Sequence, residues 1–202
     1  MINRPVILGA DGSMGRRYAA ILKYLGVDFV PVDAGDGFPA AGSFDGVLIA
    51  TPTYMHVQHI RKVWDYGVPI LCEKPLGTDL AEVLELCRDA ERDAVPLRMI
   101  NQYAQLVPVG AHGDSRYDNW RTGSDGLAHD CISVLALAAG PVVLGSHSPV
   151  WTCTINGHML SLADMDRAYV KMIQGWLTGD VEGINYIRKA HLKVAEYLEL
   201  HG

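Results

Sequence analysis

Residues 6–15 of the chain read VILGADGSMG, and this stretch indicates the fold of the region around it. A short apolar run is followed by glycines at every third position from Gly9 to Gly15. Apolar residues at helical spacing then continue to residue 25, so the stretch predicts a strand, a glycine loop and a helix. Glycines at such a turn let a pyrophosphate approach the main chain, and the free N–H groups of the helix start attract it. The spacing G-x-x-G-x-x-G differs from the usual G-x-G-x-x-G, so a plain structural turn is the alternative interpretation.

A carboxylate follows the next apolar run. Residues 29–32 read FVPV, a second expected strand, and Asp33 closes it 21 residues after Gly12. At that place a carboxylate accepts a hydrogen bond from the ribose 2′-hydroxyl of a dinucleotide and repels a 2′-phosphate. Residues 34–43 contain no Arg or Lys that could pair with such a phosphate. A solvated turn residue is the alternative for Asp33, but the loop and the carboxylate together predict NAD in preference to NADP.

Strand-like and helix-like runs continue to alternate up to about residue 103. The further strands and helices are expected at residues 46–50, 55–66, 69–72, 79–92 and 96–103. Thr78 is the expected N-cap of the helix over 79–92. Strands rich in Val, Ile and Leu that alternate with helices are typical of a parallel sheet with right-handed crossovers. The predicted fold class is therefore α/β, with a Rossmann-type dinucleotide-binding domain over residues 1–103.

The pattern changes in residues 104–202, which we expect to form a reduced α+β domain for substrate binding and oligomerisation. Residues 108–125 are rich in Gly, Asp, Ser and Asn and predict a loop, and an apolar helix is expected over 126–139. Two closing helices end the chain, and Ser161 with Asp164 three residues later is the expected start of the first.

A β-hairpin is expected between these helices, because Asn156-Gly157 stands between two short alternating runs. An isolated two-stranded ribbon is marginal in water, so its apolar residues must be buried: Trp151, Cys153, Ile155, Met159 and Leu160. The closing helices can cover one face, and the open edge of the ribbon invites a second copy of the chain. We therefore expect a homo-oligomer, with a monomer whose loop covers that edge as the alternative.

Composition excludes several classes of function. The 17 basic and 23 acidic residues give a net charge of −6, and no run of Lys and Arg marks a nucleic-acid site. The hydrophobic share of 49% is enough for a buried core. No apolar run reaches the roughly 18–20 residues of a membrane span, and the early strand leaves no room for a signal peptide. The four cysteines are expected as buried free thiols, and no His or Cys spacing indicates a metal site. We expect a cytoplasmic protein.

Four short motifs, each at the end of an expected strand, resemble those of one family. They are the loop ADGSMGRR at residues 10–17, ATPT at 50–53 followed by His56, CEKPL at 72–76 and NQY at 101–103. The sequence is similar to the Gfo/Idh/MocA oxidoreductases, the glucose–fructose oxidoreductase and inositol dehydrogenase group, with Ala10 replacing the first loop glycine. The resemblance covers residues 5–103. With the loop and Asp33, it implies these cofactor contacts: Gly9, Asp11, Gly12, Ser13, Met14, Gly15, Asp33, Thr51, Pro52, His56, Glu73, Lys74 and Asn101.

The same resemblance implies the catalytic residues. Lys74 of the E-K-P run would reach both nicotinamide and substrate, and Asp125 with His129 resembles the family's D-x-x-x-H. Spacing of i and i+4 places both side chains on one helix face, where a carboxylate can orient an imidazole. An ordinary solvated lysine is the alternative for Lys74, and a helix N-cap is the alternative for Asp125. Relatives carry a large open sheet, whereas residues 142–160 of this chain can supply two or three short strands, so the sheet is cut down to a hairpin. Trp120 and Arg121 are candidates to line the substrate site, with an ordinary surface loop as the alternative.

The implied reaction is hydride transfer between a nicotinamide and a hydroxyl or keto carbon of a sugar, a polyol or a related small molecule. Lys74 would exchange the proton of the substrate hydroxyl. His129 would share that proton or bind the same hydroxyl, with Asp125 fixing its tautomer. A non-catalytic dinucleotide-binding sensor of the same fold is the main alternative. A dihydrodipicolinate reductase shares the glycine loop, but the E-K-P run and the closing helices fit it poorly.

Overall fold

The computed structural model of the chain describes residues 1–119, 124–146, 148, 150–181 and 183–201. At residues 119, 124, 125 and 146 it describes the main chain alone. Contacts divide the chain into two compact units, residues 1–100 with 172–187 and residues 101–171 with 188–202. The domain boundary expected at residue 103 stays a prediction. Each unit is described by itself below.

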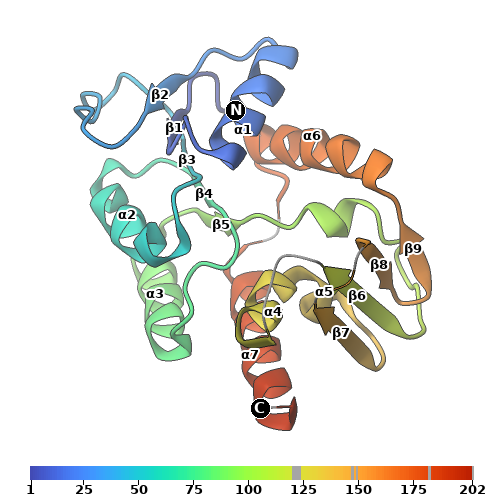
Figure 1. The fold of residues 1–202 in the computed structure, drawn as a ribbon. Coiled ribbons are helices and arrows are strands. Elements are labelled where there is room, and N and C mark those ends of the chain that lie inside the picture. Colours follow the sequence, from blue (N-terminus) through green and yellow to red (C-terminus); the bar gives the residue numbers. More distant parts are fainter. Residues whose placement is uncertain (120–123, 147, 149, 182, 202) are drawn as a thin grey trace. The chain divides into compact units, whose positions relative to one another are not determined.

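The first unit is built on a parallel sheet of five strands in the order β2-β1-β3-β4-β5 (Figure 1). The strands are β1 (Val6–Leu8), β2 (Val30–Val32), β3 (Val47–Ile49), β4 (Ile70–Cys72) and β5 (Leu97–Met99). This confirms the predicted Rossmann-type sheet. Pro31 is tolerated because β2 lies at the sheet edge. The expected strand over 96–103 is shorter, because a 3₁₀ turn, η3 (Gln102–Gln105), follows β5 closely.

Helices follow β1, β3 and β4 of this sheet. They are α1 (Ser13–Tyr24), η1 (Thr53–Met55), α2 (His56–Lys62), η2 (Trp64–Tyr66) and α3 (Leu80–Arg92). The chain moves from β1 to the β2 edge of the sheet, and then from β3 through β4 to β5 in the opposite direction. Right-handed crossovers therefore place α1 on one face and α2 and α3 on the other, as Figure 1 shows. The helix expected over 55–66 lies where it was predicted, but it consists of three shorter helical segments, η1, α2 and η2.

The start of α3 corrects one prediction. The N-cap is Asp79 and not Thr78, because the Asp79 carboxylate accepts a hydrogen bond from the Glu82 N–H at 3.1 Å. Both residue types cap helices well, so the sequence offered two adjacent candidates. The buried stripe of α3 follows helical spacing, as expected, and consists of Val83, Leu86, Cys87 and Ala90.

The second unit contains a mixed four-stranded sheet, which is larger than the expected hairpin with two or three short strands in residues 142–160. Its strands are β6 (Ser115–Asn119), β7 (Val142–Ser146), β8 (Thr152–Ile155) and β9 (His158–Leu160), in the order β7-β6-β8-β9. The loop predicted over 108–125 is wrong for residues 115–119, because β6 lies inside this sheet, parallel to β7 and antiparallel to β8. The strand was not predicted because its residues are mostly polar. Arg116 and Asp118 pair with each other on the outer face at 2.7 Å, while Ser115 and Tyr117 are buried.

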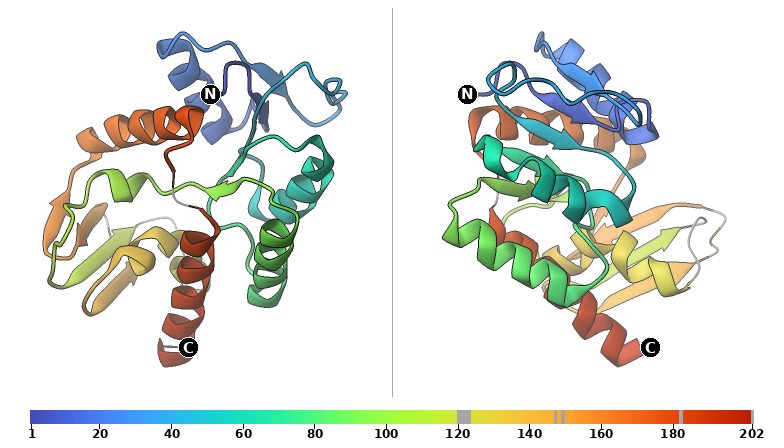
Figure 2. Two further views of the ribbon diagram at one scale, coloured as in Figure 1. Left: turned by 180° about the vertical axis from the view of Figure 1, so that it is seen from behind. Right: turned by 90° about the vertical axis from the view of Figure 1, so that its left-hand side faces the viewer.

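The two faces of this sheet differ. The helices of residues 124–137, drawn in yellow in Figure 2, lie beside this sheet. Tyr117, Cys153 and Leu160 lie on its inner face, in a core that also contains Leu127 and Val134 from these helices. On the outer face, strand register aligns Val143, Arg116, Thr154 and Met159 in one row. Met159 is 78% exposed in the single chain, so the helices of the unit do not bury it, and its burial against a second copy stays a prediction. The ribbon is not isolated either, because β6 occupies one edge of β8, and β9 forms the remaining edge.

The hairpin turn is confirmed, since Asn156 and Gly157 have φ values of +52° and +76°, as a tight hairpin turn requires. The helix expected over 126–139 is two helices, α4 (Ser124–Asp130) and α5 (Ile132–Leu137), interrupted at Cys131. The closing helices are α6 (Leu162–Thr178) and α7 (Ile184–His201). The Ser161 hydroxyl accepts a hydrogen bond from the Asp164 N–H at 3.2 Å, which confirms the predicted cap.

All four cysteines are free and buried, as predicted. Burial raises the pKa of the Cys72 thiol, and it raises the pKa of Cys153 to about 12. These thiols therefore stay protonated and behave as small apolar side chains. Among the described residues, no helix has both the length and the apolar character needed to cross a bilayer.

Candidate functional site

The carboxyl ends of the parallel strands bring the predicted cofactor residues of the first unit to one edge of the sheet. Strand register aligns Leu8 with Val32 and with Ile49, and Ile49 with Cys72. The residues that follow these positions therefore leave the sheet together: Gly9, Asp33, Ala50 and Glu73. Open parallel sheets bind their ligands at this edge.

The glycine loop is a cradle in which side chains do not fit. Gly9 has φ of +81°, and a Cβ there would lie 3.0 Å from the Ala50 carbonyl oxygen. A Cβ on Gly15 would lie 2.0 Å from the Gly9 carbonyl oxygen, well inside any real contact. Gly12 is the N-cap of α1, and it supplies no side chain to the first N–H groups of that helix. Close main-chain approach and an uncapped helix start fit the diphosphate of a dinucleotide.

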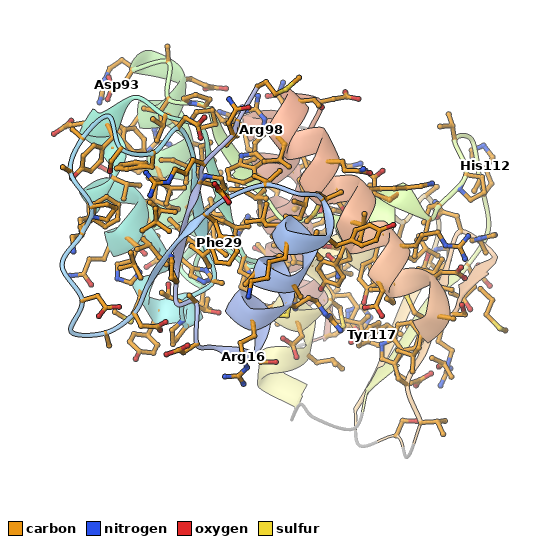
Figure 3. The ribbon with its side chains drawn as sticks, turned by 90° about the horizontal axis from the view of Figure 1, so that it is seen from above. Arg16, Phe29, Asp93, Arg98, His112 and Tyr117 are labelled. Atoms are coloured by element: carbon orange, nitrogen blue, oxygen red, sulfur yellow. The ribbon has the colours of Figure 1, made fainter. Side chains whose placement is uncertain are left out.

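The other residues of the loop hold its shape. The Arg16 guanidinium donates a hydrogen bond to the Asp11 carbonyl oxygen, and Arg16 lies on the exposed side of α1 (Figure 3). Ser13 and Met14 begin α1, with Ser13 exposed and Met14 half-buried. The loop thus combines a narrow interior at Gly15 with an exposed rim.

Asp33 is tied to the glycine loop. One of its carboxylate oxygens accepts a hydrogen bond from the Asp11 N–H at 2.7 Å. Its own N–H donates to the Asp36 carboxylate at 2.8 Å. Asp33 therefore positions the loop as well as presenting a carboxylate at the end of β2.

A cavity of about 440 Å³ opens at this edge of the sheet. It falls within the roughly 300–1,000 Å³ of small-molecule sites. Of the predicted residues it brings together five: Gly9, Gly12, Asp33, Thr51 and Pro52. Asp11, Ser13, Met14, Gly15, His56, Glu73 and Lys74 lie outside the lining of this cavity.

Sequence reasoning missed one wall of the cavity. Met55, His59 and Lys62 line it, as does Phe38 from the loop after β2. The signal was available, because spacing of i, i+4 and i+7 from residue 55 places these three residues on one helix face. The His59 ring nitrogen Nδ1 lies 2.9 Å from the Thr51 hydroxyl oxygen. Burial lowers the pKa of His59, and the nearby charges of Lys62 and His56 lower it further.

His56 holds two loops of the first unit together. It is 1% exposed, and its ring nitrogens lie 2.7 Å from the carbonyl oxygens of Pro75 and Thr51. The first carbonyl belongs to the loop after β4 and the second to the loop after β3. His56 therefore acts on the site by positioning main chain.

Glu73 and Lys74 follow β4 directly. Glu73 is 7% exposed and accepts hydrogen bonds from the Tyr18 hydroxyl of α1 and, at 2.9 Å, from the Lys74 N–H. Lys74 is half-buried, and the peptide bond between Lys74 and Pro75 is cis. The buried carboxylate thus fixes the main chain from which the Lys74 side chain projects.

The remaining predicted residues belong to the second unit. Asn101 is 4% exposed, and its side-chain oxygen accepts a hydrogen bond from the Ala104 N–H at 3.4 Å, so it caps η3. Asp125 and His129 both lie on α4, one helical turn apart, and His129 is half-buried. Trp120 and Arg121 lie outside the described residues.

Comparison with known proteins agrees with the geometry of the first unit. Residues 17–100 match the GFO_IDH_MocA model, described as an oxidoreductase family with an NAD-binding Rossmann fold. The rhizopine catabolism protein MocA of Rhizobium meliloti is 44% identical over 75 residues, which are 37% of this chain and 23% of that protein. An inositol 2-dehydrogenase of Rhodococcus jostii is 44% identical over 48 residues, which are 23% of this chain and 13% of that protein.

A solved structure agrees in fold. The myo-inositol dehydrogenase of Corynebacterium glutamicum superposes with a TM-score of 0.72 at 16% identity, covering 98% of this chain and 96% of that chain. The matched stretches span less than a quarter of the length of the two curated relatives, at 23% and 13%. Residues 17–100, which are less than half of the chain, are therefore similar to the Gfo/Idh/MocA oxidoreductase family, and the chain has the fold of a solved dehydrogenase.

Proposed function

We propose that the protein is an NAD-dependent oxidoreductase that moves a hydride between the nicotinamide and a hydroxyl or keto carbon of a sugar, a polyol or a related small molecule. The observation that carries this proposal is the meeting of the glycine cradle, Asp33 and the cavity of about 440 Å³ at the carboxyl edge of the sheet. Lys74 follows a strand that ends at the same edge. The named activities of the matched relatives, inositol 2-dehydrogenase among them, support the substrate class.

The main chain of the loop and the start of α1 would bind the diphosphate, and Asp33 would accept a hydrogen bond from the adenosine ribose. The nicotinamide supplies the redox chemistry when it is bound. Lys74 then takes the proton from the substrate hydroxyl in oxidation and returns it in reduction. Glu73, held by Tyr18, positions Lys74 through its main chain. The resemblance assigns Asp125 and His129 to the same proton exchange.

Cofactor titration tests the proposal. We expect NADH to bind about 10-fold more tightly than NADPH, because a hydrogen bond to a charged group contributes ~1.5–3 kcal/mol. Asp33→Asn is the sharpest variant, since the amide oxygen can still accept from the Asp11 N–H while the charge is gone. It should bring the two affinities to within about 2-fold, measured by the fluorescence of either reduced cofactor.

Asp33→Ala is the matched comparison, because it removes the loop contact as well as the charge. It should weaken both cofactors, and Asp33→Asn should leave NADH binding stronger than Asp33→Ala does. Equal or tighter binding of NADPH by the unaltered chain would overturn the NAD assignment. Tight NADH binding without turnover of any sugar or polyol would favour a non-catalytic dinucleotide-binding sensor.

We also propose a homo-oligomer that uses the outer face and free edge of the β7-β6-β8-β9 sheet. Met159 on β9 and Val143 on β7 lie in one row of that face and are 78% and 51% exposed. Free strand edges and exposed apolar side chains invite a symmetric partner. Met159→Asp should therefore shift the particle to monomer mass in light scattering during gel filtration.

Val109→Asp is the matched control, since Val109 is an exposed apolar residue on a loop of the same unit. It should leave the mass unchanged. Trp151→Asp is unsuited to this test, because Trp151 packs against the core of the unit and edge-on to Tyr117. A single species of 22.0 kDa for the unaltered chain would end the proposal.

We further propose a reducing, cytoplasmic location, which the four free and buried thiols support.

A further inference from the structure

The cavity at the carboxyl edge carries charges of both signs. Asp33 and Asp36 line it from the loop after β2, and His59 and Lys62 line it from α2. Residues 34–43 contain no Arg or Lys, but this does not mean that the cavity lacks a cation. A cation reaches the same cavity from another element of the first unit.

The side chain of Lys62 is held at the cavity wall. Its ammonium lies 5.7 Å from the centroid of the Phe38 ring, and Phe38 lines the cavity too. Phe38 is fixed by the rings of Tyr66 and Phe44, whose centroids lie 5.3 and 5.5 Å from its own. An ammonium over an aromatic face is attracted by the ring quadrupole. This contact keeps the Lys62 ammonium beside the loop that follows Asp33, because Phe38 belongs to that loop.

Among the described residues, Lys62 forms no ion pair with a carboxylate, and its ammonium lies over the Phe38 ring. Its neighbour Arg61 is the opposite case. Arg61 forms an ion pair with Asp89 at 2.5 Å and lies over the Trp64 ring at 4.9 Å. Arg61 is also absent from the cavity lining. Of these two adjacent cations of α2, Arg61 is paired with a carboxylate away from the cavity, whereas Lys62 lines the cavity. Lys62 is therefore the one placed to attract an anionic ligand.

We propose that Lys62 is a specificity-determining residue that receives the 2′-phosphate of NADP(H), so that the chain accepts this cofactor as a weaker second choice beside NAD(H). The inference rests on the proposed function, because it concerns the adenosine end of the same cofactor. A lysine ammonium on its flexible stem binds phosphate as a point charge. NADP(H) stays second because the carboxylates of Asp33 and Asp36 repel the phosphate that Lys62 attracts. His59 adds little attraction near neutral pH, because its pKa is lowered.

The experiment separates the 2′-phosphate from the rest of the cofactor. Calorimetry with 5′-AMP and with adenosine 2′,5′-diphosphate measures binding alone, and fluorescence titration with NADH and NADPH extends it to whole cofactors. Lys62→Ala should weaken adenosine 2′,5′-diphosphate and NADPH by about 10-fold, the scale of a lost charge-assisted hydrogen bond. The affinities for 5′-AMP and NADH should change by less than about 2-fold, since neither carries the 2′-phosphate that Lys62 receives.

Arg61→Ala is the matched control and should leave all four affinities unchanged, because its charge is paired with Asp89. Lys62→Arg should retain most of the affinity for adenosine 2′,5′-diphosphate. Equal weakening of NADH and NADPH by Lys62→Ala, or no weakening of either, would overturn the inference. So would an unaltered chain that binds NADH and fails to bind NADPH. If the unaltered chain binds none of the four ligands, the proposed function itself falls.

Discussion

Gly15→Ala should abolish useful dinucleotide binding, with NADH affinity lowered by about 100-fold or more. The new Cβ would lie 2.0 Å from the Gly9 carbonyl oxygen and 2.7 Å from the Ala10 main chain. Both neighbours are main-chain atoms, so the loop itself has to move. Overpacking of this kind costs ~1–3 kcal/mol or more, and ~2.7 kcal/mol already corresponds to 100-fold in affinity.

Gly37→Ala is the matched control for this prediction. Gly37 belongs to the same unit, and a Cβ there would meet no atom within 4 Å. Its NADH affinity should remain that of the unaltered chain, and its thermal unfolding should not change. Fluorescence titration and circular dichroism measure the two properties. A Gly15→Ala chain that binds NADH normally would show that the diphosphate does not use this loop.

Lys74→Ala should lower kcat by roughly 10²-fold or more once a substrate is found, because a lost acid–base group has effects of that scale. The thermal midpoint should move little, since Lys74 is half-buried and lies after the strand instead of in the apolar core. Cofactor affinity, measured separately, should fall far less than kcat does.

Lys23→Ala serves as the control, because Lys23 lies in the last turn of α1, far along the helix from the glycine loop. It should keep the unaltered kcat. His129→Ala belongs in the same assay, as the resemblance assigns it to the same proton exchange. A Lys74→Ala chain with full kcat would remove the proposed base and leave the dinucleotide-binding sensor as the better account.

Local patterns predicted the first unit well. Apolar runs of three or four residues, a glycine loop and helical spacing each depend on neighbours in the sequence, and the parallel sheet follows from their alternation. The hairpin turn at Asn156-Gly157 and the cap at Ser161 were predictable for the same reason. Where two cap residues stood side by side, at Thr78 and Asp79, propensity alone could not decide between them.

The second unit shows where such patterns fail. The strand β6 reads SRYDN and has the composition of a loop. Its Asp118 is nevertheless 8% exposed, because it accepts hydrogen bonds from Arg116 at 2.7 Å and from Thr152 of β8 at 2.8 Å. Gly145 of β7 lies beneath the same carboxylate, and a Cβ there would be 2.1 Å from it. Polar residues can build a strand when hydrogen bonds satisfy them, and here one partner, Thr152, comes from a distant part of the chain.

The sequence by itself determined the sheet of the first unit, the glycine loop, the carboxylate at its second strand and the family resemblance, because each depends on short-range spacing. Only the tertiary structure decided that Asp33 also holds the loop through the Asp11 N–H, and that α2 brings His59 and Lys62 to the same cavity. It also decided that the hairpin belongs to a four-stranded sheet. The physical reason is common to all three. Hydrogen bonds across a sheet and the walls of a cavity join residues that are far apart in the sequence, so no local pattern encodes them.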